Sequence, residues 1–426
     1  MSIEAKTILD LAEQFKEGMV ADRREIHKNP EVGACLPKTK EYVKKRLSEM
    51  GYEPVEICES GIVATITGED TGKCILLRAD MDGLKVQERT ELDFKSENGN
   101  MHACGHDMHT AMLLGAAKLL KEQEKELKGT VKLVFQPDEE GFTGAKTMLK
   151  AGVLQNPAPE AGLALHVHSG SPSGLVLCGR GTCMAGCTLF RVRVKGVGCH
   201  GAMPETGVDP INIAAHIYLA LQEITAREIP AKSPAVVTIG KFSGGQAPNI
   251  IPQDAVIEGT IRTFDRDLSA SILQRIQDIS EATAKAFRGS AVVEEMASAP
   301  PLINNPELAN QMAGFVTELF VESPPPVQST YGGRKDEKSP SGACTYGGRK
   351  VYLMDEGGMG SEDFSSYTYE IPCAYLLIGA GTKDENPLYG EPMHNEKVVF
   401  NEDILWRGAA IHTYCAMKWL EQEETK

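Results

Sequence analysis

Residues 104–109 place a thiol, two imidazoles and a carboxylate within six positions, in the order Cys-Gly-His-Asp-Met-His. Cysteine, histidine and acidic side chains are the usual ligands of zinc and similar transition metals. Two further groups lie downstream: residues 136–140 end in two adjacent glutamates, and residues 165–168 carry two histidines. Each group follows an apolar run that is typical of a strand. Together they predict a metal centre assembled along one edge of a sheet.

The spacing within these groups suggests separate roles. Cys104 and His106 are two residues apart, so both side chains can point the same way from an extended segment. Glu139 and Glu140 are adjacent, so one carboxylate can bind a metal while the other accepts a proton from a water that the metal activates. Taken alone, the first pair could be a buried thiol and a capping imidazole. The second pair could be a solvated helix start, where carboxylates suit the helix dipole.

Composition limits the class of protein. A chain of 426 residues is long for one core, which predicts two domains. The net charge of −15 argues against nucleic acid as a partner, since phosphate binding needs a basic surface. No apolar run reaches the ~18 residues that a membrane helix needs, and the first 15 residues do not resemble a secretory signal. The 11 cysteines show no disulfide-like spacing, which predicts reduced thiols and a cytoplasmic protein.

Alternating strands and helices are expected to position the three groups. The strands are predicted at 61–68, 74–79, 130–135 and 161–167, and the helices at 107–125 and 141–151. This alternation predicts an α/β domain with a mostly parallel sheet and helices on both faces. Ligands bind beyond the carboxyl ends of the strands in such sheets, where all three groups are expected to lie.

The pattern changes near residue 187. Strands predicted at 188–195, 235–242, 255–264 and 291–296, with a helix after Pro210 and another at 268–287, follow the β-α-β-β-α-β order of a ferredoxin-like domain. We therefore predict a lid and dimerisation domain at 187–298, inserted into a discontinuous catalytic domain at 1–186 and 299–426. Residues 322–350 hold a repeated hexapeptide and predict a solvated loop, or alternatively a loop that caps the substrate or an oligomer contact.

Several motifs together carry a family resemblance. They lie at residues 24–31, 77–84, 201–204, 249–252, 360–364 and 393–395, and in the three groups above. With these motifs the chain resembles the aminoacylase/carboxypeptidase family of two-metal peptidases, which implies a zinc-peptidase-like catalytic domain. Within that family it resembles the amidohydrolase subgroup of hippurate hydrolases, indole-acetyl-amino-acid hydrolases and N-acetyl-diaminopimelate deacetylases.

The resemblance implies a role for each matching residue. It implies two divalent ions per chain, zinc, manganese or cobalt, with Cys104 bridging them. Glu139 would be the general base, and His200 would stabilise the oxyanion. Asn249 and Arg262 would bind substrate, Arg262 through a substrate carboxylate. The implied metal ligands are Cys104, His106, Glu140, His166 and His394.

The predicted function is metal-dependent hydrolysis of the amide bond of an N-acyl amino acid, a small-molecule substrate. The alternatives are a dipeptidase or carboxypeptidase, and a catalytically silent, metal-stabilised binding protein. The resemblance further implies a homodimer or higher homo-oligomer, in which His200 and Asn249 act on the site of a partner subunit. Cys199, Asp138 and Lys85 stand where the family usually has Gly, Ala and Pro, which bears on the choice of substrate.

Overall fold

The computed structural model describes residues 4–68, 70–320, 351–354 and 357–422. The whole predicted loop at 322–350 therefore lies outside the described residues. The chain divides into two compact units. The first comprises Met1–Cys183, Ile303–Glu356 and Ser366–Lys426, and the second comprises Met184–Leu302 and Gly357–Ser365. The division into a catalytic domain at 1–186 and 299–426 and a lid at 187–298 stays a prediction.

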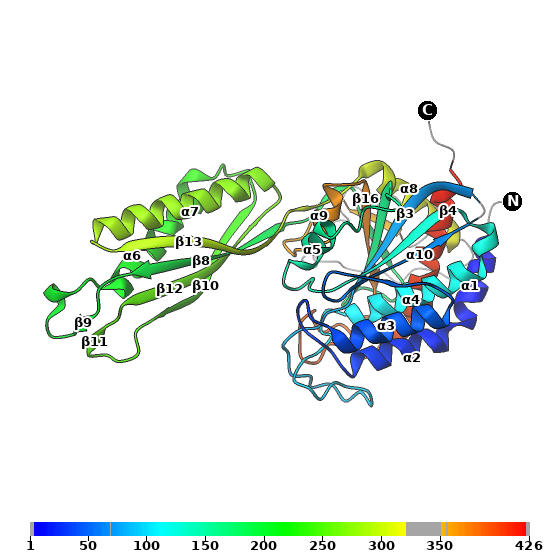
Figure 1. The fold of residues 1–426 in the computed structure, drawn as a ribbon, viewed down its shortest axis with the longest axis horizontal. Helices are drawn as coiled ribbons and strands as arrows, with labels where there is room; N and C mark the ends of the chain where they lie inside the picture. The colour runs from blue at the N-terminus through cyan, green and yellow to red at the C-terminus, as the bar shows by residue number, and fades with distance from the viewer. Residues whose placement is uncertain (1–3, 69, 321–350, 355–356, 423–426) are drawn as a thin grey trace. The chain divides into compact units, whose positions relative to one another are not determined.

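The first unit is built on an eight-stranded sheet in the order β1-β2-β4-β3-β5-β16-β6-β15 (Figure 1). Strands β4, β3, β5 and β16 run parallel to one another in its centre, and antiparallel neighbours lie toward its edges. The strands are β1 (Val55–Ile57), β2 (Gly61–Thr67), β3 (Asp70–Asp80), β4 (Lys128–Gln136), β5 (Ala161–His168), β6 (Val176–Gly179), β15 (Val351–Met354) and β16 (Cys373–Gly379). Two shorter strands, β7 (Gly181–Met184) and β14 (Leu302–Asn304), pair with each other.

Helices pack against this sheet and against one another. In Figure 1, α1, α2, α3 and α4 lie together beside the sheet, and α10 runs close to α4 and α1. The helices are α1 (Ala5–Gln14), α2 (Lys16–His27), α3 (Pro37–Glu49), α4 (His106–Glu122), α5 (Gly144–Lys150), α8 (Pro306–Leu319), α9 (Ser365–Thr368) and α10 (Leu405–Leu420). Single helical turns lie at Glu124–Glu126 and Glu402–Ile404.

Successive side chains of the central strands point to opposite faces of the sheet, and both faces are buried. In β4, Val131, Leu133 and Phe135 join the main apolar core with α4, α8 and α10, whereas Lys132 and Val134 point to the other face and are also buried. Because both faces are covered, the strand is an almost continuous buried run, as parallel sheets require. The mostly parallel α/β fold predicted from the sequence is confirmed.

The second unit has a four-stranded antiparallel sheet in the order β10-β12-β8-β13. Its apolar core lies between one face of this sheet and the helices α6 and α7, which Figure 1 shows running along the strands. The chain order β8-α6-β10-β12-α7-β13 is ferredoxin-like. The elements are β8 (Gly186–Lys195), β9 (Cys199–His200), α6 (Pro210–Glu223), β10 (Ala235–Gly244), β11 (Ile250–Ile251), β12 (Asp254–Thr263), α7 (Arg266–Ala286) and β13 (Ser290–Ala299), with short helical turns at Pro204–Thr206 and Ile224–Glu228.

Membrane-spanning helices and disulfide bonds are both absent from the part of the chain that the structure describes. Within 4–68, 70–320, 351–354 and 357–422, no helix combines the length and apolar character needed to cross a bilayer. The ten cysteines in the same ranges are all free thiols.

A buried lysine anchors the loop after α5. The Lys132 side chain is 1% exposed, and its ammonium donates to the carbonyl oxygens of Val153 (2.9 Å), Gln155 (2.8 Å) and Pro157 (2.6 Å). Three acceptors match the three N–H groups of an ammonium, so the buried charge is fully hydrogen-bonded. The lysine therefore fixes the connection that leads into β5.

We expect Lys132→Met to lower the free energy of unfolding of the first unit by about 3 kcal/mol, because it leaves three carbonyls without a donor. Lys128→Met, at the exposed start of the same strand, should change it by less than about 0.5 kcal/mol. Urea unfolding followed by tryptophan fluorescence measures this, since Trp406 and Trp419 both lie in α10 of that unit. Equal unfolding curves for the two variants would contradict the role given to Lys132.

Candidate metal centre

The carboxyl ends of three parallel strands meet at one edge of the first unit's sheet. β3 ends at Asp80, β4 at Gln136 and β5 at His168. Because these strands run in the same direction, the segments that follow them lie close together. The chain after β4 carries Glu139 and Glu140, and α4 begins at His106.

Gly105 sets the direction in which α4 begins. It has a left-handed backbone, with φ of 84°, directly before His106. A Cβ atom at this position would lie 2.4 Å from the Val167 side chain. Both observations require glycine here, and both allow Cys104 and His106 to approach the end of β5.

Cys104 lies at the centre of the predicted ligands. Its sulfur is 3.6 Å from His166 Nε2 and 3.2 Å from His394 Nε2. The ligand atoms of Cys104, His106 and His166 all lie within 4.8 Å of one another, and so do those of Cys104, Glu140 and His394. The structure therefore brings the five predicted ligands together as two triads that share one sulfur. This sharing is what a bridging thiolate requires.

His394 reaches this cluster from a distant part of the chain. Its backbone has a φ of 66°, an uncommon value for a residue other than glycine, and its N–H donates to the Ala103 carbonyl (2.9 Å). The bond fixes His394 beside Cys104. A strained backbone that is held in place by its surroundings is typical of functional sites.

The ring of His106 shows what the site would bind. Its Nδ1 is 3.2 Å from Asp82 Oδ1, while its buried Nε2 has no hydrogen-bond partner among the described residues. Three carboxylates surround this Nε2 at 3.8–3.9 Å, those of Asp80, Glu139 and Glu140. A lone pair facing three negative groups is repulsive unless positive charge lies between them. Thiolate, imidazole and carboxylate donors around such a point fit a divalent transition metal.

The pKa shifts of His106 and His394 agree that the cluster attracts positive charge, whereas burial acts the other way at His166. Burial opposes protonation of His106, yet Asp80 and Cys104 hold its pKa well above the usual value. Hydrogen bonds to Cys104 and Glu140 raise the pKa of His394 to about 10. Burial lowers the pKa of His166 well below its usual value, which keeps this ring neutral. Burial raises the pKa of the Cys104 thiol, so a metal would have to displace its proton.

Two aspartates behind the cluster are fully buried and hydrogen-bonded. Asp82 accepts the backbone N–H of Glu139 (3.1 Å) and of Glu140 (3.2 Å) in addition to its contact with His106. One carboxylate therefore orients three of the neighbouring groups. Asp80 accepts from Arg78 (2.6 Å); burial opposes its ionisation, but Arg78 and His106 hold its pKa well below the usual value.

Glu139 lies inside the same edge of the sheet. Its side chain is nearly buried, and one of its oxygens lies 3.9 Å from His106 Nε2. Glu140 lies equally far from that nitrogen, but it is also 3.3 Å from His394 Nε2 and belongs to the second triad. The two adjacent carboxylates thus share the His106 imidazole, and the added contact of Glu140 with His394 suits a division of labour between a ligand and a base.

A buried charge network behind α4 was missed by the sequence analysis. Asp107 accepts from Arg23 (2.6 Å) and contacts His27 Nδ1 (2.8 Å), and His27 Nε2 lies 3.2 Å from Glu88. All four side chains are buried. The network joins the start of α4 to α2 and to the loop that precedes α4. The motif at 24–31 contains His27 of this network. Its partner Glu88 lies 61 positions further along the chain, and Asp107 lies 84 positions after Arg23.

The remaining predicted site residues lie in the second unit. His200 on β9 is exposed and pairs with Ile250 of β11, and its Nδ1 accepts the N–H of Ala202 (3.0 Å). The carbonyl of Asn249 accepts the N–H of Gly201 (2.8 Å), so His200 and Asn249 are close neighbours. Arg262 on β12 donates to the Met359 carbonyl (3.0 Å) and to the Ser361 hydroxyl (2.9 Å).

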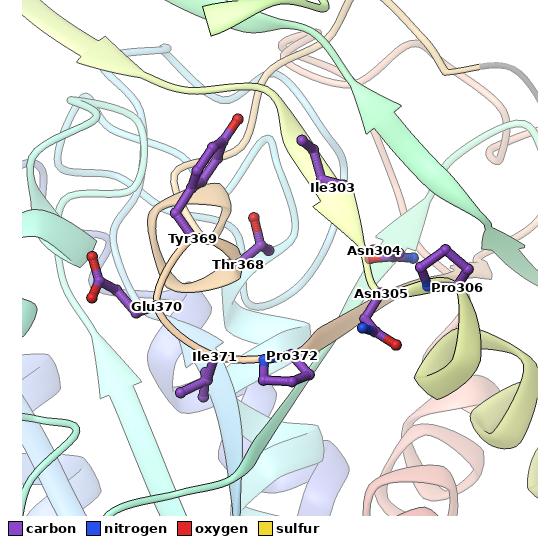
Figure 2. Close-up of a pocket in the computed structure, with 9 residues that line it drawn as sticks. All are labelled: Ile303, Asn304, Asn305, Pro306, Thr368, Tyr369, Glu370, Ile371 and Pro372. Carbon is purple, nitrogen blue, oxygen red and sulfur yellow. The ribbon is translucent and has the colours of Figure 1, made fainter.

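A cavity of ≈ 320 Å³ lies elsewhere in the first unit, at the amino ends of α8 and β16 (Figure 2). It is lined by Ile303, Asn304, Asn305, Pro306, Thr368, Tyr369, Glu370, Ile371 and Pro372, which include no thiol or imidazole. Asn304 uses its side chain to bind the Gly179 carbonyl (2.9 Å) and the backbone of Tyr375 (2.7 and 3.0 Å). This cavity is therefore separate in its chemistry from the metal-ligand cluster.

Comparison with known proteins identifies relatives over nearly the whole chain. The protein-family model described as "Peptidase family M20/M25/M40" matches residues 76–336. The chain is 37% identical to the IAA-amino acid hydrolase ILR1-like 4 of Arabidopsis thaliana, over 95% of this chain and 86% of the relative. It is 35% identical to the hippurate hydrolase of Campylobacter jejuni, over 97% and 98%.

A solved structure agrees with these relatives. The YXEP protein of Bacillus subtilis, described as a dinuclear metal binding peptidase from the M20 family, superposes with a TM-score of 0.74 at 28% identity. The superposition covers 96% of this chain and 100% of that one. The chain thus belongs to peptidase family M20/M25/M40 and is an amide-cleaving hydrolase.

Proposed function

We propose that this protein hydrolyses the amide bond of N-acyl amino acids with two divalent metal ions. The observation that carries the proposal is the pair of triads that share the Cys104 sulfur, with a second carboxylate, Glu139, beside them. Relatives named as hydrolases of IAA-amino acids and of hippurate support an acylated amino acid as the substrate.

Cys104, His106 and His166 would hold one ion, and Cys104, Glu140 and His394 the other. Zinc, manganese or cobalt would suit this mixture of sulfur, nitrogen and oxygen donors. Such ions supply Lewis acidity, which polarises an amide carbonyl and makes water a stronger acid. Asp82 supports the ligands by holding the His106 ring and the backbone of Glu140.

Glu139 would serve as the general base. A carboxylate here can take up a proton from the attacking water and deliver it to the leaving nitrogen. Its backbone N–H is held by Asp82, and its side chain is nearly buried, so the group is fixed in position and shielded from bulk water. A carboxylate that is fixed and shielded suits proton transfer better than it suits metal binding at the Cys104–Glu140–His394 triad.

The residues of the second unit would complete the site. His200 would stabilise the oxyanion, Asn249 would hold substrate, and Arg262 would pair with a substrate carboxylate after exchanging its present contact with Ser361. We also propose a homodimer or higher homo-oligomer, in which His200 and Asn249 serve a partner's site, and a cytoplasmic location.

The first test is hydrolysis by the metal-stripped protein, before and after addition of Zn²⁺, Mn²⁺ or Co²⁺. We expect activity on N-acetyl, N-benzoyl and indole-acetyl amino acids that is lost on stripping and returns with metal. Unblocked dipeptides serve as the comparison. Faster cleavage of dipeptides would favour a dipeptidase, and bound metal without hydrolysis of any substrate would favour a silent binding protein.

We expect Glu139→Gln to lower kcat by at least ~10²-fold, because the change removes the base but keeps the shape of the side chain. Metal content and the unfolding curve should stay close to those of the native protein. Asp138→Asn is a matched control, since it changes the neighbouring carboxylate in the same way and keeps a side-chain oxygen to accept from the Thr143 hydroxyl. A metal-loaded Glu139→Gln variant with native turnover would exclude Glu139 as the base.

Removing the shared sulfur should affect both ions, whereas removing an outer ligand should affect one. We expect Cys104→Ala to weaken both binding steps, and His394→Ala to weaken only the step that involves Glu140. Calorimetric titration of the stripped variants with Zn²⁺ resolves the two steps. Two native-like steps in Cys104→Ala would show that the sulfur does not bridge.

A further inference from the structure

His109 is a buried histidine, the last residue of the Cys-Gly-His-Asp-Met-His group at 104–109. It lies in the first turn of α4, and 1% of its surface is exposed. Its Nδ1 lies 2.6 Å from Asp80 Oδ1, and its Nε2 lies 2.9 Å from the backbone nitrogen of Val167. The ring therefore connects α4 to the carboxyl ends of both β3 and β5.

These two contacts fix the protonation state of the ring. A backbone N–H can only donate, so Nε2 must accept from Val167. The proton of a neutral imidazole then lies on Nδ1 and is donated to the Asp80 carboxylate. Neither nitrogen keeps a lone pair for a metal, although His109 lies close to His106 and Asp80. His109 is therefore not a ligand in this arrangement.

The bond to Val167 acts on the peptide group that joins it to His166. The N–H of this peptide is bound by His109, and the carbonyl of Val167 is 2.6 Å from His166 Nδ1. His166 is thus held at its ring and at the peptide group that follows it. Its Nε2 faces the Cys104 sulfur at 3.6 Å. The rings of His109 and His166 lie 4.3 Å apart, so the two also pack directly.

We propose that His109 is a positioning residue of the metal centre: its Nδ1-protonated ring holds the end of β5 so that His166 presents Nε2 to the ion at the Cys104–His106–His166 triad. This inference rests on the proposed metal centre and adds a residue to it. His109 acts on the metal centre through His166, without touching the metal or the substrate.

Three substitutions separate the two hydrogen bonds. His109→Asn keeps a donor near the position of Nδ1, His109→Gln keeps an acceptor near the position of Nε2, and His109→Leu removes both. His412→Leu is the matched control, because His412 on α10 is equally buried and has no hydrogen-bond partner on either ring nitrogen among the described residues.

The readout is titration of the stripped protein with Co²⁺, followed by the absorption of the thiolate-bound ion, independently of any substrate. We expect His109→Leu to weaken one of the two binding steps by about 10–100-fold, the usual effect of losing a group that orients a ligand. His109→Gln should keep more affinity than His109→Leu, and His412→Leu should differ from the native protein by less than about 2-fold.

A double-mutant cycle distinguishes positioning from general destabilisation. In a His166→Ala background, His109→Leu should cause no further loss of Co²⁺ affinity, because the residue it orients is already gone. Equal additional loss in both backgrounds, or native Co²⁺ affinity in His109→Leu, would overturn the inference. A native protein that binds no Co²⁺, Zn²⁺ or Mn²⁺ would instead overturn the metal centre itself.

Discussion

The arrangement of the first unit depends on one electrostatic constraint: carboxylates and imidazoles crowd around Cys104 in a largely buried space. Three carboxylates lie within 3.9 Å of the Nε2 of His106, and each must be kept ionised without bulk water. Unpaired buried charge is costly, so the surroundings must supply donors or cations. Arg78 and the ring of His109 supply them to Asp80, and the ring of His394 supplies them to Glu140. The backbone N–H groups of Glu139 and Glu140 serve the neighbouring Asp82 in the same way.

The sheet makes this crowding possible because it fixes where the donors lie. β3, β4 and β5 are parallel and adjacent, so Asp80 and Asp82, the two glutamates and His166 emerge at one edge within reach of a single helix start. The buried contact between Arg23 and Asp107 then holds that helix start from behind. A buried pair of this kind contributes little net stability, but loss of one partner would leave an unpaired charge beside the predicted ligand His106.

The sequence predicted the composition of the cluster because strand-like runs precede each group and the residue types match metal chemistry. It also predicted both folds, since hydrophobic periodicity is a local property. Short strands such as β6, β9 and β11 were missed, because two to four residues carry too little periodicity.

The parts that sequence reasoning could not supply depend on contacts between distant residues. His394 joins the cluster through a left-handed backbone and a bond to Ala103, which no spacing rule reveals. The tautomer of His109 follows only from knowing that a backbone N–H lies against Nε2. The contact of Arg262 with Ser361 likewise joins residues 99 positions apart, so the sequence alone does not reveal it.

Two departures from the family pattern have local explanations that leave the cluster unchanged. Asp138 does not add a third free carboxylate beside Glu139, because its side chain accepts from the Thr143 hydroxyl and packs over Gly141, where a Cβ would meet it at 2.3 Å. It thereby closes the turn that presents the two glutamates. Cys199 precedes His200 on a strand, so the two side chains point to opposite faces. The Cys199 sulfur packs against Gly207, where a Cβ would lie 2.5 Å away, on the face away from the His200 side chain.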